Sequence, residues 1–350
     1  MESYFTHQSL IKAPPIKRAA YSDRTAWMMA ELSRLVYERL PNEQELENLL
    51  DIIFTCIKKN KPRNETLTHI NDLAKQANSP QESITEKILD SVNYKLINSH
   101  AVLGTEVMVV DIPADISCNF PGMFVIVFRG TETDSIKDIK TDISAQLIPA
   151  PGGGKIHSGF LAAYQKVEDD LIQEIEKAGD KPIYITGHSL GGALAMIATK
   201  YLAGDSIGAT YTFGAPRVAD DAFYEGIKTP VYRVVNSADG VARLPFGAGF
   251  SIFLSGIRYI PINGTKRLSE FLRKHIEGYT HYGHLVMLTD ISSTKSGTKS
   301  GLKVLHSPNV FGVVNRILPR MIMTLGKAAA ADHKMAGYCE KLAQYAKTRI

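Results

Sequence analysis

Cysteine is scarce in this sequence. The chain has three cysteines among 350 residues, and they lie far apart at Cys56, Cys118 and Cys339. An odd, scattered set fits neither a disulfide framework nor a zinc-binding pattern. We therefore expect a reducing compartment.

Long apolar runs and a strong excess of charge are also missing. No uncharged apolar stretch reaches the roughly 18 residues that a membrane span needs, and residues 1–20 show no apolar core of signal-peptide length. The 40 basic and 36 acidic residues leave a net charge of +4, too small to indicate nucleic-acid binding. We expect a globular protein without a nucleic-acid partner, either cytoplasmic or exported by a route that cleaves no signal peptide.

Hydrophobic periodicity divides the chain into a helical first part and an alternating second part. After an N-terminal arm over residues 1–20, "SDRTAWMMAELSRLVYERL" predicts a helix with a Ser-Asp start and one buried face. Helical periods continue over about 41–98. Short apolar strands are predicted to begin at Thr105, Met123, Pro182, Ile207 and Val231. Helices between the last four strands predict an α/β fold with a mostly parallel sheet covered on both faces.

One strand-to-helix turn has the pattern of a nucleophile elbow. The stretch "YITGHSLGGALAM" places Ser189 in Gly-x-Ser-x-Gly, between an apolar strand and an alanine-rich helix. In such an elbow the glycines let the chain turn tightly, and the helix N-terminus favours a developing negative charge. The pattern favours Ser189 as an acyl-transfer nucleophile, although a structural glycine-rich turn would look similar. His188 is predicted to face away from the attack site and to be structural.

A serine nucleophile needs a carboxylate and a histidine, which follow it in that order in α/β hydrolases. Asp239 fits the acid because it lies in "VVNSADGVARLP", just after the predicted strand "VYRVVN". Asp205, Asp220 and Asp221 are alternatives, for which a surface or helix-capping role is the simpler interpretation.

The negative charge that forms on the substrate needs hydrogen-bond donors. The backbone N–H of Leu190, the residue after Ser189, is one candidate. The other is Thr131 in "VIVFRGTET", which could offer its N–H and its hydroxyl. Arg-Gly-Thr could also be a plain turn at the end of a strand.

Taken together, several motifs resemble the class 3 lipases, the family typified by fungal triacylglycerol lipases. In the family's order, the chain contains "FRGT" (128–131), "HSGF" (157–160), "GHSLGGALA" (187–195), "YTFGAPRV" (211–218) and "VVNSADGVARLP" (234–245). The resemblance implies an α/β-hydrolase fold with helical insertions. It also implies Ser189 as nucleophile, Asp239 as acid, and Thr131 with Leu190 as the oxyanion hole.

The catalytic base must be chosen among several histidines. Five histidines follow Asp239, at positions 275, 281, 284, 306 and 333. His275 lies in a charged stretch and His306 in a loop. His281 precedes "YGHLVML" and His284 lies within it, and this segment could be a strand of the sheet. His333 lies in "ADHKMAGYCEKL", which looks like the Asp-His…Tyr segment that carries the family's catalytic histidine. The resemblance therefore implies His333.

The chain departs from the family pattern where a lid is expected, and a later segment is the candidate replacement. The family usually carries a short lid with a tryptophan, but "ETDSIKDIKTDISAQL" has many charges and Ile139 near the tryptophan's place. A later basic segment, "PNVFGVVNRILPRMIMTLGKAA", has apolar residues on one helical face. Such a helix could lie on a membrane surface or simply cap the core.

These features predict one α/β-hydrolase domain over residues 1–350. It carries the arm over 1–20, a helical insertion over about 41–98 and a cap-like insertion over about 261–328. The resemblance implies a serine hydrolase of lipid esters that needs no metal or organic cofactor, with peripheral contact to a lipid surface as an open option. A phospholipase A1, a monoglyceride lipase, or an inactive lipase-like binding module are the alternatives.

Overall fold

The structure is a computed structural model of the 350-residue chain. It describes residues 4–6, 20–38, 54, 58, 67, 83–102, 104–131, 146–202, 206–244, 278–289, 303–308, 324 and 327–348. Within these residues, every helix is too short or too polar to cross a membrane.

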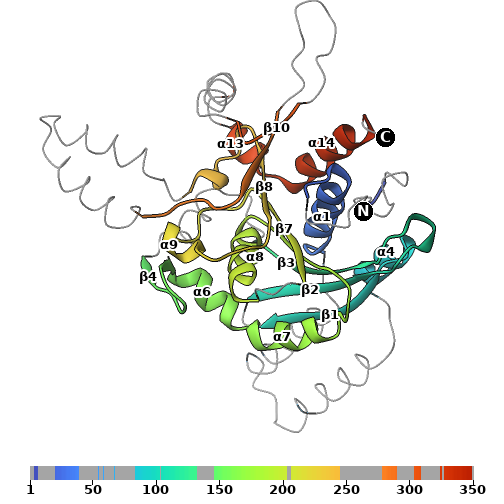
Figure 1. Ribbon diagram of the computed structural model, residues 1–350, viewed down its shortest axis with the longest axis horizontal. Coiled ribbons are helices and arrows are strands. Elements are labelled where there is room, and N and C mark those ends of the chain that lie inside the picture. The colour runs from blue at the N-terminus through green and yellow to red at the C-terminus, as the bar shows by residue number, and fades with distance from the viewer. Residues whose placement is uncertain are drawn as a thin grey trace, which may run out of the picture.

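A large, mostly parallel sheet organises the described part of the chain (Figure 1). Its eight strands in these ranges lie in the order β1 (Lys95–Val102), β2 (Thr105–Ile112), β3 (Met123–Phe128), β6 (Ile183–His188), β7 (Ile207–Phe213), β8 (Val231–Asn236), β9 (His284–Leu288) and β10 (Val304–His306). Strands β3, β6, β7, β8 and β9 run parallel to one another. The other three strands pair antiparallel at the two edges.

The sheet separates two hydrophobic cores, and β3 shows why its strands are apolar throughout. One core contains Met123, Val125 and Val127. The other core contains Phe124, Ile126 and Phe128. Side chains on a strand point alternately to opposite faces, so a strand buried on both faces needs an unbroken apolar run.

Two helices from opposite ends of the sequence cover one face of the sheet. Helix α1 (Asp23–Leu35) lies beside α14 (Met335–Lys347) in Figure 1, and the two pack against each other. The side chain of Ser22 caps α1, as the Ser-Asp start predicts. Helix α1 is buried almost all around rather than on one face, because it is enclosed between the sheet and α14.

Helices from the middle of the chain cover the opposite face. They are α6 (Ser158–Gln165), α7 (Glu168–Glu176), α8 (Leu190–Tyr201) and the short α9 (Asp221–Tyr224). Helix α8 follows β6 directly and contacts β6, β7 and β3. The turn between β6 and α8 therefore lies at the carboxyl edge of the central parallel strands.

Shorter elements complete the described structure. Helix α4 (Ile84–Ser91) begins at Ser83 with a capping box to Glu86 and leads into β1. Strands β4 (Leu147–Pro149) and β5 (Lys155–His157) form a separate two-stranded sheet. The remaining pieces are the 3-10 turns η2 (Ile116–Cys118) and η3 (Val241–Arg243) and helix α13 (Ala328–Ala331).

The α/β fold and all five predicted strands are confirmed, but two boundaries are wrong. The helical insertion does not extend to about residue 98, because Lys95–Val102 is strand β1, paired with β2. The insertion predicted over about 261–328 is not a cap throughout, because strands β9 and β10 lie within this range and belong to the central sheet. Most of the helical insertion, the segment after Thr131 with Ile139, and residues 309–323 lie outside the described residues.

Candidate active site

Ser189 occupies the strained turn between β6 and α8. Its backbone has φ 56° and ψ −126°, a left-handed conformation that non-glycine residues seldom adopt. Glycines surround the turn because it is so tight. A Cβ at Gly187 would overlap the backbone of Gly191, and one at Gly191 would overlap the backbone of Phe128. The local sequence thus allows a serine to stand at the very start of a helix.

The structure brings Ser189, His333 and Asp239 together. Nε2 of His333 lies 2.9 Å from Oγ of Ser189. Nδ1 of His333 lies 3.0 Å from Oδ2 and 3.1 Å from Oδ1 of Asp239. All three side chains are buried, and Asp239 is completely so. The arrangement links a hydroxyl, an imidazole and a carboxylate in one chain of hydrogen bonds.

Backbone and side-chain donors orient the Asp239 carboxylate. The backbone N–H of Val241, in the turn η3, donates to Oδ1 over 2.9 Å. The hydroxyl of Tyr338, on α14, donates to Oδ2 over 2.6 Å. With His333 these donors surround the carboxylate, so its orientation is determined from three directions.

Two further residues fasten the His333 segment to the loop that carries the acid. Oδ2 of Asp332 accepts the backbone N–H of Ala238 over 2.9 Å. The side-chain amide of Asn236 donates to the Asp332 carbonyl over 2.8 Å. Sequence reasoning did not single out Asp332 or Asn236, although both lie inside the segments that suggested the acid and the base.

Two half-buried arginines also hold the acid loop. The guanidinium of Arg243 donates to the carbonyls of Asp239 and Ser237. Arg217, from "YTFGAPRV", donates in turn to the carbonyl of Arg243. Burial lowers the pKa of Arg243 while the Asp239 charge opposes that shift, and burial lowers the pKa of Arg217 to about 10. Both groups stay protonated at neutral pH and keep donating to these carbonyls.

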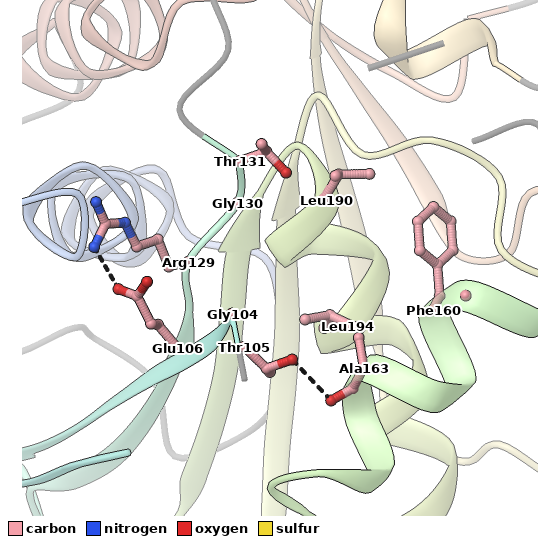
Figure 2. Close-up of a pocket in the computed structure, with 11 residues that line it drawn as sticks. Gly104, Thr105, Glu106, Arg129, Gly130, Thr131, Phe160, Ala163, Leu190 and Leu194 are labelled. Carbon is pink, nitrogen blue, oxygen red and sulfur yellow. Dashed lines mark hydrogen bonds and ion pairs between the residues drawn. The ribbon is translucent and has the colours of Figure 1, made fainter. Parts of the chain in front are cut away.

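Leu190 and Thr131, the predicted oxyanion donors, lie across from each other beside the serine turn (Figure 2). Leu190 is the first residue of α8, so its N–H has no acceptor within the helix. Thr131 follows β3 and is exposed. Donors at these two places would meet a negative charge that forms next to Ser189, aided by the α8 dipole.

Leu190 and Thr131 also line a pocket of about 480 Å³. Phe160 and Leu194 form an apolar part of its wall (Figure 2). The rest of the pocket wall includes polar groups. Arg129 forms an ion pair with Glu106, and the Thr105 hydroxyl donates to the Ala163 carbonyl (Figure 2). A pocket of this size and mixed lining suits a small organic group.

The other histidines considered as base do not contact Ser189 in the described structure. Nε2 of His281 donates to the Ala242 carbonyl over 2.8 Å, whereas His284 is exposed on β9. His306 packs against the ring of Tyr21, and His275 lies outside the described residues.

The alternative acids are also separate from the site where they are described. Asp220 caps α9 through a hydrogen bond from the Phe223 N–H, and Asp221 belongs to the first turn of that helix. Asp205 lies outside the described residues. Among the residues that the structure describes, no group of three or more His, Cys, Asp or Glu side chains is placed to hold a metal ion.

Comparisons with known proteins agree on one family. The model of the family "Lipase (class 3)" matches residues 125–248. A lipase of Rhizomucor miehei is 35% identical over 149 residues, which cover 38% of this chain and 40% of that protein. A secreted mono- and diacylglycerol lipase of Malassezia restricta is 34% identical over 145 residues, 36% of this chain and 48% of the relative. The chain thus spans less than half the length of the curated relatives it matches.

Solved lipase structures are similar at a lower level. The native Rhizomucor miehei lipase propeptide complex has 24% sequence identity and a TM-score of 0.47, covering 69% of this chain and 68% of that chain. The residues that the family model matches include the serine turn and the acid loop. On these matches, the chain is similar to the class 3 lipase family over residues 125–248.

Proposed function

We propose that this protein hydrolyses carboxylic esters of lipids through an acyl-serine intermediate. The observation that carries the proposal is the chain of hydrogen bonds from Ser189 through His333 to Asp239, at the carboxyl edge of the parallel strands. A hydroxyl beside an imidazole whose other nitrogen faces a buried carboxylate is the arrangement that activates serine for acyl transfer.

The proposed reaction has two halves. Oγ of Ser189 attacks the ester carbonyl while Nε2 of His333 accepts its proton, and Asp239 stabilises the resulting imidazolium. The N–H of Leu190 and the donors of Thr131 hold the oxyanion. As the intermediate collapses, His333 gives the proton to the departing alcohol. Water, deprotonated by His333, then attacks the acyl-serine. As the bond between Oγ of Ser189 and the acyl carbon breaks, His333 returns the proton to Oγ, and the carboxylic acid leaves.

The pocket beside the serine supports an acyl group as its occupant. The apolar side chains of Phe160 and Leu194 can pack against a hydrocarbon chain, while Thr131 and Leu190 stand next to the carbonyl. Its volume of about 480 Å³ favours acyl chains of short or medium length. Glycerides are the favoured lipid class because the Malassezia relative is named as a mono- and diacylglycerol lipase. A phospholipase A1 activity is the other candidate from the sequence.

A fluorophosphonate probe, which reacts with activated serines, tests the enzyme assignment. The wild type should be labelled, and Ser189→Ala should not. Equal labelling of both proteins would contradict the proposal, and no labelling of the wild type would favour a lipase-like binding module. p-Nitrophenyl esters of increasing chain length, with glyceride and phospholipid emulsions, would then define the substrate. Hydrolysis of none of them would also overturn the proposal.

A further inference from the structure

The histidine next to the nucleophile has both of its ring nitrogens engaged. His188 is the last residue of β6 and is buried. Its Nε2 lies 2.7 Å from the backbone carbonyl oxygen of His333. Its Nδ1 lies 2.9 Å from the hydroxyl of Tyr37, which follows α1. The ring therefore connects the N-terminal helix to the residue that carries the proposed base.

These two contacts determine the tautomer of His188. A carbonyl oxygen only accepts hydrogen bonds, so Nε2 must carry the proton. Burial, and next the neighbouring His333, hold the pKa of His188 well below its usual range. The ring is therefore neutral, Nδ1 carries no proton, and the Tyr37 hydroxyl donates to it.

The His188 ring also packs against the ring of His333. The two ring centroids are 4.6 Å apart with an angle of 33° between the planes. In the proposed reaction His333 becomes positively charged for part of each cycle. A neutral neighbour can support that ring from the side, whereas a second cation at this distance would repel it. The neutral tautomer of His188 thus suits its place next to the base.

We propose that His188, oriented by the Tyr37 hydroxyl, is a positioning residue for His333. The inference rests on the proposed function, because His333 acts as the base only in that reaction. His188 donates to the His333 main chain and packs on its ring, so it restricts both the position and the tilt of the imidazole. Catalysis by a base depends on such positioning, and a displacement of about 1 Å can lower the rate on the order of 100-fold.

Replacing His188 tests this role through kcat. His188→Phe keeps a ring but removes the donor to the His333 carbonyl. We expect kcat on a soluble p-nitrophenyl ester to fall about 10- to 100-fold, because the base loses its alignment. KM should stay within about twofold, because the ester does not contact His188. His188→Gln should recover most of kcat, since its amide nitrogen can reach the position of Nε2 and donate to the same carbonyl.

Tyr37→Phe removes only the hydroxyl that donates to Nδ1 of His188, at a half-buried position. We expect kcat to fall about threefold to tenfold, less than in His188→Phe, because the donor to His333 remains but the ring has lost its second hydrogen bond and is held less firmly. The double variant should match His188→Phe alone, since Tyr37 acts through His188. Independent, multiplicative losses would contradict that link.

Ser33→Ala is the matched control. It removes a buried hydrogen bond of 2.9 Å between Ser33 and Thr186, which joins the same helix α1 to the same strand β6 but does not reach His333. It should lower the melting temperature and leave kcat unchanged. If His188→Phe and Tyr37→Phe lose no more kcat than Ser33→Ala, or if His188→Gln is no better than His188→Phe, the positioning role is wrong.

The same series separates this inference from the proposed function. If the wild type hydrolyses the ester and Ser189→Ala does not, the function stands, and the His188 variants decide the positioning role alone. If the wild type hydrolyses no ester, the proposed function fails first. Should His188→Phe not fold, Tyr37→Phe against Ser33→Ala decides: an equal kcat in these two variants overturns the inference.

Discussion

The hydroxyl of Tyr338 donates a hydrogen bond to Oδ2 of Asp239 over 2.6 Å. The Tyr338 hydroxyl oxygen also accepts a hydrogen bond from the backbone N–H of Asn236 over 3.0 Å. Burial, and next the Asp239 carboxylate, raise the pKa of Tyr338 well above its usual range. The hydroxyl therefore stays protonated and keeps donating at any physiological pH. Helix α14 thus orients the proposed acid, while the proposed base lies just before the same helix.

Removing this hydroxyl should lower turnover. In Tyr338→Phe, Asp239 loses a donor and the N–H of Asn236 loses its acceptor. A hydrogen bond to a charged group contributes about 1.5–3 kcal/mol, and about 1.4 kcal/mol corresponds to a tenfold change in rate. We expect kcat to fall about tenfold, within a range set by how far Asp239 reorients. Steady-state kinetics on a soluble ester measure this.

Tyr282→Phe is the control for Tyr338→Phe. It removes a hydroxyl that donates to the Ile227 carbonyl over 2.9 Å, away from the serine turn. It should reduce stability without changing kcat. A kcat loss in Tyr338→Phe no larger than in Tyr282→Phe would mean that Tyr338 is only structural.

Filling the pocket should shorten the acyl chain that the protein accepts. Ala163 lines the pocket on α6, so Ala163→Leu adds a side chain inside it. We expect kcat/KM to fall on the order of 10-fold or more for octanoate esters and little for acetate esters, because only the longer chain meets the new group. Kinetics across p-nitrophenyl esters of increasing length check this. The control is Ala162→Leu, at the exposed neighbouring position, which should leave the dependence of kcat/KM on chain length unchanged. If Ala163→Leu lowers kcat/KM equally for all esters, the acyl chain does not bind in this pocket.

His281 should make the protein less stable at acidic pH. Burial, and next Arg233 and Arg217, hold the pKa of His281 well below its usual range. Below about pH 6.5 the unfolded chain binds a proton at this histidine while the folded chain does not, so stability falls as the pH falls. One such group contributes a slope of about 1.4 kcal/mol per pH unit.

Urea unfolding of the wild type and His281→Gln between pH 7.5 and 5 tests this linkage. The variant keeps an amide that can donate to the Ala242 carbonyl but has no group that titrates in this range. The slope of its free energy of unfolding against pH should be smaller by about 1.4 kcal/mol per pH unit, which corresponds to the uptake of one proton. His188 is the same in both proteins, so its contribution cancels in the comparison. Identical slopes would show that His281 is protonated in the folded state as easily as in the unfolded chain.

Elements with a strong local signal could be predicted from the sequence. The apolar run of β3 and the alternation of strands with amphipathic helices depend only on neighbouring residues, and these elements are confirmed. Strand β1 was mistaken for helix because it is an edge strand whose burial is irregular, so its pattern resembles a helical period. Strand β10 has only three residues and gives almost no pattern.

The candidate site likewise has one part that neighbouring residues determine and another part that joins distant segments. The elbow around Ser189 is local, since its glycines and its strand-to-helix turn are contiguous in the chain. The family resemblance pointed to Asp239 and His333, and the structure brings both to the serine. Their catalytic roles remain predictions for the experiments above.

The sequence by itself determined strands β2, β3, β6, β7 and β8 in their order, the tight turn at Ser189 and the candidates for acid and base, because these follow from local periodicity, glycine placement and motif order. Only the tertiary structure decided which of five histidines lies against the serine, because His333 is distant from Ser189 along the chain and reaches it through the packing of α14 on α1. The contacts of Tyr338, Asp332 and His188 were decided there too, since each joins segments that no local pattern connects.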